Sequence, residues 1–159
     1  MSINKVSKGR IGAASLALKG GDLRITRIPV ITLSASEVNT GVQLPAGAVV
    51  RHVALDTTTV EATAATKTIS IGTLSSESGG NASGFLTGVS TASAAVIGPS
   101  LAGTPTRGAL LRESASATSG GTVPVPVDYI LSSARTISYT LASAHTELKA
   151  DIVLTYLVL

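Results

Sequence analysis

The two histidines are the residues whose neighbours could support chemistry. His145 lies two positions before Glu147, and in an extended strand both side chains would share one face, as a metal-binding or acid–base pair requires. No third ligand accompanies them, and the zinc-deaminase pattern that contains such a pair also needs cysteines, which this chain lacks. We therefore interpret His145 as a turn histidine beside a solvent-facing glutamate. His52 alternates with Val50 and Ala54, and we interpret it as a structural histidine of a sheet.

Patterns for other nucleophiles and for phosphate binding are missing from the sequence. Serine is abundant, but none lies in the Gly-x-Ser-x-Gly elbow of hydrolases. Lys67-Thr68 lacks the preceding glycine loop that cradles phosphate. The glycine-rich run 79–84 leads into another loop, so we expect a flexible loop tip there. The carboxylates do not follow calcium-loop spacing. The sequence thus predicts no enzyme, no cofactor and no metal ion.

Charge is distributed unevenly along the chain. The first 27 residues contain six lysines and arginines against one aspartate, whereas acidic residues outnumber basic ones in the rest. Because apolar residues lie between these charges, we predict a basic N-terminal arm, residues 1–27, that docks on an acidic protein surface; the alternative is a solvated, poorly ordered terminus. The arm has no aromatic side chain for base stacking, which disfavours nucleic acid as its partner. The candidate partner-binding residues are Lys5, Lys8, Arg10, Ile11, Leu16, Leu18, Lys19, Arg24 and Arg27.

The composition limits how the rest of the chain can fold. Of 159 residues 44% are hydrophobic but only 3% aromatic, which predicts one core of small and β-branched side chains between thin sheets. The lack of cysteine excludes disulfides, thiolate metal sites and cysteine nucleophiles. No apolar run approaches the roughly 20 residues that cross a bilayer. The run 11–18 is short, broken by glycine and not followed by a cleavage site, so we expect neither a membrane partner nor a secretory signal.

Period-two alternation predicts the elements that hold these side chains. In residues 135–141 and 147–159 apolar and polar residues alternate, which predicts two strands paired as a half-buried antiparallel hairpin. Turn residues about every eight to twelve positions separate further predicted strands at 28–33, 48–55, 67–74, 84–89, 109–112 and 123–131. The predicted fold class is all-β: an antiparallel β-sandwich or jelly roll over residues 28–159, with an extended N-terminal arm.

Five segments occur in the order and at the spacing of a known family. They are LPAGAVV (44–50), TKTISIGT (66–73), GFLTGVS (84–90), ARTISYT (134–140) and LTYL (154–157). In them the chain resembles the small β-sandwich virion proteins of tailed bacteriophages that decorate, or cement, the capsid exterior. The resemblance covers most of residues 28–159 and rests on strand and turn residues.

The resemblance implies a structural role in the virion. The expected protein is a jelly-roll subunit, made in the host cytoplasm, that forms a homotrimer or a dimer on the capsid exterior. It would bind the major capsid protein and bridge neighbouring capsomers, with the arm lying along the lattice or swapped onto a neighbouring subunit. One alternative is a fibre or receptor-binding module that contacts a host surface through loops 75–83 and 92–106; another is a hydrolase or lyase on a jelly roll.

Overall fold

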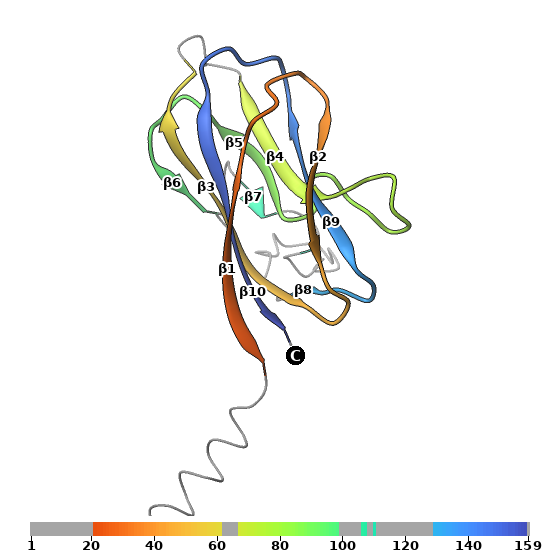
Figure 1. The fold of residues 1–159 in the computed structure, drawn as a ribbon. Coiled ribbons are helices and arrows are strands. Elements are labelled where there is room, and N and C mark those ends of the chain that lie inside the picture. The colour runs from red at the N-terminus through yellow and green to blue at the C-terminus, as the bar shows by residue number, and fades with distance from the viewer. Residues whose placement is uncertain (1–20, 62–66, 99–105, 108–109, 111–128, 159) are drawn as a thin grey trace, which may run out of the picture.

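The described part of the chain is built from β-strands. The computed structural model describes residues 21–61, 67–98, 106–107, 110 and 129–158 (Figure 1). None of these residues forms a helix long and apolar enough to cross a membrane. The strands are β1 (Asp22–Pro29), β2 (Glu37–Leu44), β3 (Val49–Thr59), β4 (Thr68–Thr73), β5 (Leu86–Ser90), β6 (Val96–Ile97), β7 (Thr106–Arg107), β8 (Tyr129–Ile130), β9 (Arg135–Leu141) and β10 (Lys149–Val158).

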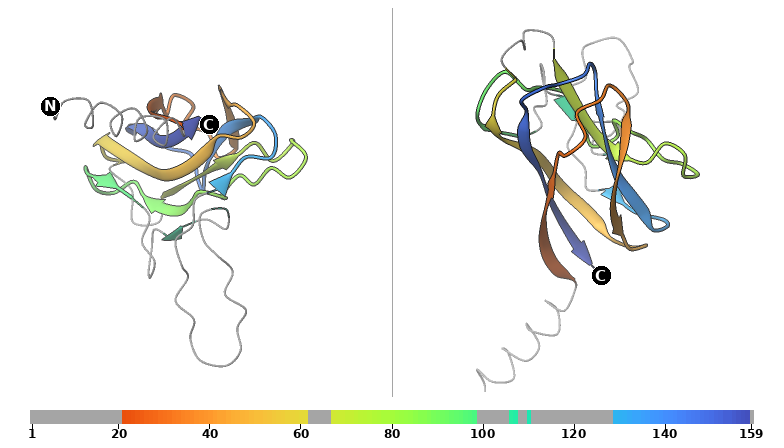
Figure 2. Two further views of the ribbon diagram at one scale, coloured as in Figure 1. Left: turned by 90° about the horizontal axis from the view of Figure 1, so that it is seen from below. Right: turned by 45° about the horizontal axis from the view of Figure 1, so that its top comes forward.

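The strands form two sheets that pack face to face (Figures 1 and 2). The first sheet has the order β1-β10-β3-β6, with β8 also paired to β3, and the second has the order β2-β9-β4-β5-β7. Every strand pair is antiparallel. Consecutive strands mostly belong to different sheets, so most connections cross from one layer to the other. This arrangement confirms the predicted antiparallel β-sandwich.

The core lies between the sheets and takes alternate residues from the strands. Both sheets contribute side chains of one hydrophobic cluster. The alternation predicted for the last two strands is confirmed, because the buried apolar residues are Ile137, Tyr139 and Leu141 in β9 and Ala150, Ile152, Leu154 and Tyr156 in β10. At about 25 cal/mol per Å² of apolar area, such burial is the main force that holds the two sheets together.

The predicted hairpin between the last two strands is wrong. β9 lies in the second sheet between β2 and β4, whereas β10 lies in the first sheet between β1 and β3. Their buried side chains belong to the same core but come from opposite layers, and the connection 142–148 crosses between them (Figure 1). A period-two pattern identifies which face of a strand is buried but not which strand is its neighbour. Both arrangements bury the same residues.

The first strand begins earlier than predicted. Residues 28–33 were the predicted strand, but β1 extends from Asp22 to Pro29 and pairs along its whole length with β10. Arg24 and Arg27, which the sequence assigned to the arm, therefore lie in the sheet. The sequence also did not predict β2, in which only Leu44 is fully buried. Both are edge strands of their sheets, so water reaches them and the apolar alternation that marks a strand is weak.

The glycine-rich loop 75–83 is fastened to the sandwich, in contrast to the flexible tip that its glycines predict. The Glu77 carboxylate accepts the backbone N–H of Thr136 at 3.1 Å from each of its oxygens. The N–H of Thr73 donates to the carbonyl of Asn81, and the N–H of Asn81 donates to the Thr73 hydroxyl, both at 2.9 Å. The loop is thus held to β9 and to the end of β4.

Gly80 in this loop should not accept a side chain. A Cβ atom at this position would overlap the carbonyl oxygen of Leu74. We expect Gly80→Ala to lower the free energy of unfolding by about 1–3 kcal/mol, because the backbone of the loop must shift to make room. The measurement is urea denaturation. Ser78→Ala, an exposed position in the same loop, is the control and should change stability by less than about 0.5 kcal/mol. Equal midpoints for the two variants would contradict the predicted clash.

Candidate functional site

The two histidines lie in different surroundings. His145 is buried in the connection between β9 and β10, where its Nε2 lies 2.9 Å from the Thr91 hydroxyl and its Nδ1 lies 2.8 Å from the carbonyl of Ser143. Both ring nitrogens thus have protein partners. The side chain of Glu147 is exposed, as predicted, and His52 is exposed on β3. Among the described residues, no three His, Cys, Asp or Glu side chains are grouped so that they could hold a metal ion.

Glu61 has the most hydrogen-bonded carboxylate of the described residues, and the sequence did not single it out. It follows β3 and is only 2% exposed. Its Oε1 accepts hydrogen bonds from Lys67 Nζ at 2.7 Å and from the Thr146 hydroxyl at 3.0 Å. Its Oε2 accepts the backbone N–H groups of Thr146 at 2.8 Å and Glu147 at 3.0 Å. These bonds, the one from Lys67 first and the one from the Glu147 amide next, hold the pKa of Glu61 far below its ordinary value of 4.5 despite burial.

Glu61 connects three loops at one end of the sandwich. Its own N–H donates to the carbonyl of Thr91, which follows β5, and the Thr91 hydroxyl is bonded in turn to His145. We call Glu61, Lys67, Thr91, His145 and Thr146 the polar cluster. The cluster ties the β3–β4, β5–β6 and β9–β10 connections to one another. Because its polar atoms bond to each other, the cluster stabilises the packing of these three connections.

Acid should weaken the fold through two carboxylates. Burial opposes ionisation of Glu37, but the hydroxyl and amide of Ser75 outweigh it, so the pKa of Glu37 also lies below 4.5. Groups with a lower pKa in the folded state stabilise it at pH values above their unfolded pKa. That contribution should be lost progressively as the pH falls from about 5 toward 2. Urea midpoints across this range test the expectation. The urea midpoint of Glu61→Gln should fall less steeply with decreasing pH than that of the native chain. Identical slopes of midpoint against pH would contradict the expectation.

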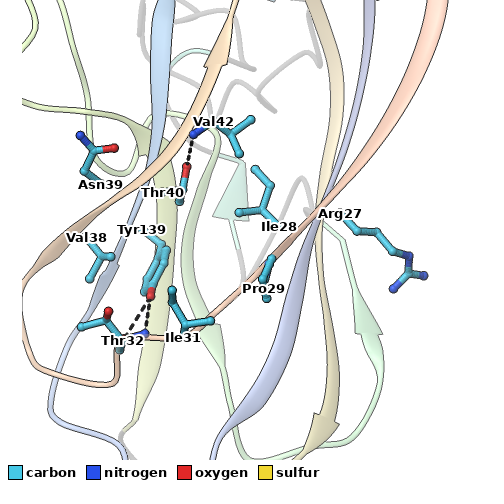
Figure 3. A pocket seen from close by; sticks show the side chains of 10 residues that line it. All are labelled: Arg27, Ile28, Pro29, Ile31, Thr32, Val38, Asn39, Thr40, Val42 and Tyr139. Atoms are coloured by element: carbon cyan, nitrogen blue, oxygen red, sulfur yellow. Dashed lines mark hydrogen bonds between the residues drawn. The ribbon is translucent and has the colours of Figure 1, made fainter.

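A groove opens between the edge strands of the two sheets (Figure 3). It has a volume of about 170 Å³. Tyr139 lies against it, and its hydroxyl accepts the N–H of Thr32 at 2.9 Å and donates to the carbonyl of the same residue at 3.1 Å. Ile31 on the rim is 78% exposed. The residues that line the groove are Arg27, Ile28, Pro29, Ile31, Thr32, Val38, Asn39, Thr40, Val42 and Tyr139. The groove is mostly apolar.

Two of the predicted partner-binding residues lie in β1, and both are paired within the chain. Arg27 Nη1 lies 2.7 Å from Asp56 Oδ2 and 3.4 Å from Asp151 Oδ2. Asp56 and Asp151 are directly opposite in the β3–β10 ladder, and Arg27 offsets their mutual repulsion. Arg24 Nε lies 3.3 Å from Asp22 Oδ2. The other predicted partner-binding residues, Lys5, Lys8, Arg10, Ile11, Leu16, Leu18 and Lys19, lie outside the described residues.

The exposed apolar residues gather near the edges of the first sheet. Leu23 and Ile25 on β1 are 58% and 68% exposed, and Leu23 is next to Leu157 of β10 in the ladder. Val96 of β6 and Ile130 of β8 lie at the opposite edge of the sheet. The sequence placed Leu23 and Ile25 in the arm and not in a strand. Of the alternative recognition loops, 75–83 is fastened as described above, and 99–105 within 92–106 lies outside the described residues.

The chain was compared with known proteins at the level of sequence and of structure. The sequence matches no known family and no curated protein. Its fold is similar to a chain in a solved structure entitled "Cyanophage Pam1 capsid asymmetric unit". The two share 15% sequence identity with a TM-score of 0.55, and the match covers 89% of this chain and 88% of that chain. At this identity the likeness shows a shared fold, and it extends over nearly the whole of both chains.

Proposed function

We propose that this protein is a structural component of a phage virion that decorates the outside of the capsid. The observation that carries the proposal is the likeness over 89% of the chain to a chain of a cyanophage capsid asymmetric unit. A match of this extent is far longer than one supersecondary motif. The five short segments of strand and turn residues that resemble capsid decoration proteins point to the same role.

The strand order supports a jelly roll. In the sheets β1-β10-β3-β6 and β2-β9-β4-β5, strands from the beginning and the end of the chain alternate, as two Greek keys wrapped around one core produce. Jelly rolls are common in viral capsids. The polar cluster supports a role without turnover, because His145 has both ring nitrogens bonded and Glu61 is neutralised by Lys67.

The proposed partner is the major capsid protein, which the arm would bind with Lys5, Lys8, Arg10, Ile11, Leu16, Leu18 and Lys19 while the sandwich projects outward. Arg24 and Arg27 instead stabilise β1. A homo-oligomer, the trimer or dimer that the resemblance implies, would place several arms on neighbouring capsomers and so bridge them. Several weak contacts held in one particle then add up to strong attachment.

The test is a binding comparison between two surfaces. Purified protein is mixed with heads that lack it and, separately, with intact host cells, and the bound fraction is measured by co-sedimentation. The proposal predicts saturable binding to heads and none above background to cells. Binding to cells alone would support the receptor-binding alternative and would overturn the proposal. Binding to neither would overturn both.

A further inference from the structure

The outer side of β1 has no partner strand among the described residues. β1 is the first strand of its sheet, and within the described ranges β10 is the strand that pairs with it (Figure 1). Leu23 and Ile25 are largely exposed on it. An unpaired edge that carries apolar side chains is a surface to which another strand can add through backbone hydrogen bonds.

The hydrogen-bond pattern shows which backbone groups of β1 point outward. The N–H of Val30 donates to the carbonyl of Ala150 at 2.9 Å, and this pair continues the β1–β10 register without a shift. Bonded pairs alternate along an antiparallel ladder, so even-numbered residues of β1 bond to β10 and odd-numbered residues direct their N–H and C=O groups away from it. The outward positions are Leu23, Ile25, Arg27 and Pro29. Pro29 has no N–H, so the series of outward residues that carry both backbone groups ends before it.

The charges on β1 are compatible with an identical strand. Arg24 is paired with Asp22, and Arg27 is paired with Asp56 and Asp151. Each charged side chain of the strand therefore has an opposite charge within its own chain. Such an edge does not select a strongly charged partner, and it does not repel a second copy in a register that keeps the arginines apart.

We propose that the outer side of β1 binds β1 of a second copy of this chain, antiparallel, with Ile25 opposite Ile25. In this register Leu23 lies opposite Arg27 of the second copy. All three outward positions that have both backbone groups are then paired, and the Leu23 and Ile25 side chains of the two copies form one apolar strip.

The neighbouring registers are less favourable. Pairing centred on Arg24 places two arginines directly opposite each other, where like charges destabilise. Pairing centred on Thr26 places Leu23 opposite Pro29, which cannot donate a hydrogen bond. Pairing centred on Leu23 places Ile25 opposite Gly21, whose φ of 108° lies outside the extended strand.

This contact closes after two copies, because each uses the same surface. It predicts a dimer, and so selects one of the two oligomeric states, trimer and dimer, that the resemblance implies. The inference goes beyond the proposed function, since it concerns the free protein and requires no capsid. Binding to heads and pairing of β1 can therefore fail separately.

The first experiment measures mass in solution by light scattering or sedimentation. The native protein should have twice the 15.8 kDa mass of one chain. Ile25→Pro removes an outward N–H without breaking a bond to β10, so it should leave the melting temperature nearly unchanged and raise the dimer dissociation constant at least about tenfold. Thr26→Pro, the matched control, removes a bond to β10 and should lower the melting temperature. A monomeric or trimeric native protein, or equal effects of the two prolines on melting, would overturn the inference.

The second experiment tests the register by cross-linking, which the cysteine-free chain makes simple. Ile25→Cys should form a disulfide-linked dimer under mild oxidation, because opposite residues of a ladder lie within disulfide reach. Leu23→Cys should cross-link more slowly, since in the proposed register the two copies of residue 23 lie several residues apart. Ser78→Cys gives the background rate from random collision. If Ile25→Cys cross-links no faster than Ser78→Cys, the proposed pairing is wrong.

Discussion

Deleting residues 2–20 should lower the occupancy of the protein on heads at least about tenfold, because each lost arm removes one of several linked contacts. The sandwich should survive the deletion, since β1 begins at Asp22 and the described core lies C-terminal to it. The melting temperature should therefore change by less than about 2 °C. Occupancy is measured by co-sedimentation with heads that lack the protein.

Two further arm variants separate charge from apolar contact. Replacing Lys5, Lys8, Arg10 and Lys19 by glutamine should weaken binding and reduce its dependence on salt, because screening acts on exposed charges. Replacing Ile11, Leu16 and Leu18 by serine should weaken binding without changing the salt dependence. Unchanged occupancy in the deletion variant would contradict the role of the arm and leave the sandwich as the binding surface.

Glu61→Ala should lower the melting temperature by on the order of 10 °C, which would be among the largest effects of a single substitution in this chain. The substitution leaves the Lys67 ammonium without its carboxylate and the N–H groups of Thr146 and Glu147 without an acceptor. Unpaired, partly buried donors and a lost ion pair are both unfavourable. Thermal unfolding followed by circular dichroism measures the change. Glu147→Ala, an exposed carboxylate on the same loop, is the control and should change melting little.

The order of the Glu61 variants tests the cause. Glu61→Gln can keep one oxygen toward the two backbone N–H groups but directs its amide toward Lys67, so its melting temperature should lie between those of Glu61→Ala and the native chain. Adding Lys67→Met to Glu61→Gln should recover part of the loss, since the two side chains are coupled. Additive effects of the two substitutions would show that the ion pair does not stabilise this end of the sandwich.

The sequence predicted the class of fold but not which strands are neighbours in each sheet. Ile152 and Leu154 lie at alternate positions of β10 and face the core, as the period-two pattern indicated. The same pattern could not distinguish a hairpin from two strands in opposite sheets, because both bury the same face. Edge strands were the weakest point, since β1 and β2 bury few side chains and their apolar residues therefore show no clear period.

The functional residues were harder to predict than the strands. Glu61 has no motif around it. Its hydrogen-bond partners Lys67 and Thr146 lie beside it only because the loops that contain them meet at this end of the sandwich. No local pattern in the sequence reports such a contact. Arg27 was predicted to bind a partner protein, but in the structure its guanidinium pairs with Asp56, which is distant in sequence and adjacent only in the folded sheet. Leu23 and Ile25 matter through their exposure, which depends on β1 being an edge.

The position of this protein in an averaged image of purified phage particles tests the central proposal most directly. The account predicts density of the size of the sandwich on the outer surface of the head, repeated across the lattice and in contact with neighbouring capsomers. Density found at the tail tip alone, with a bare head surface, would contradict it.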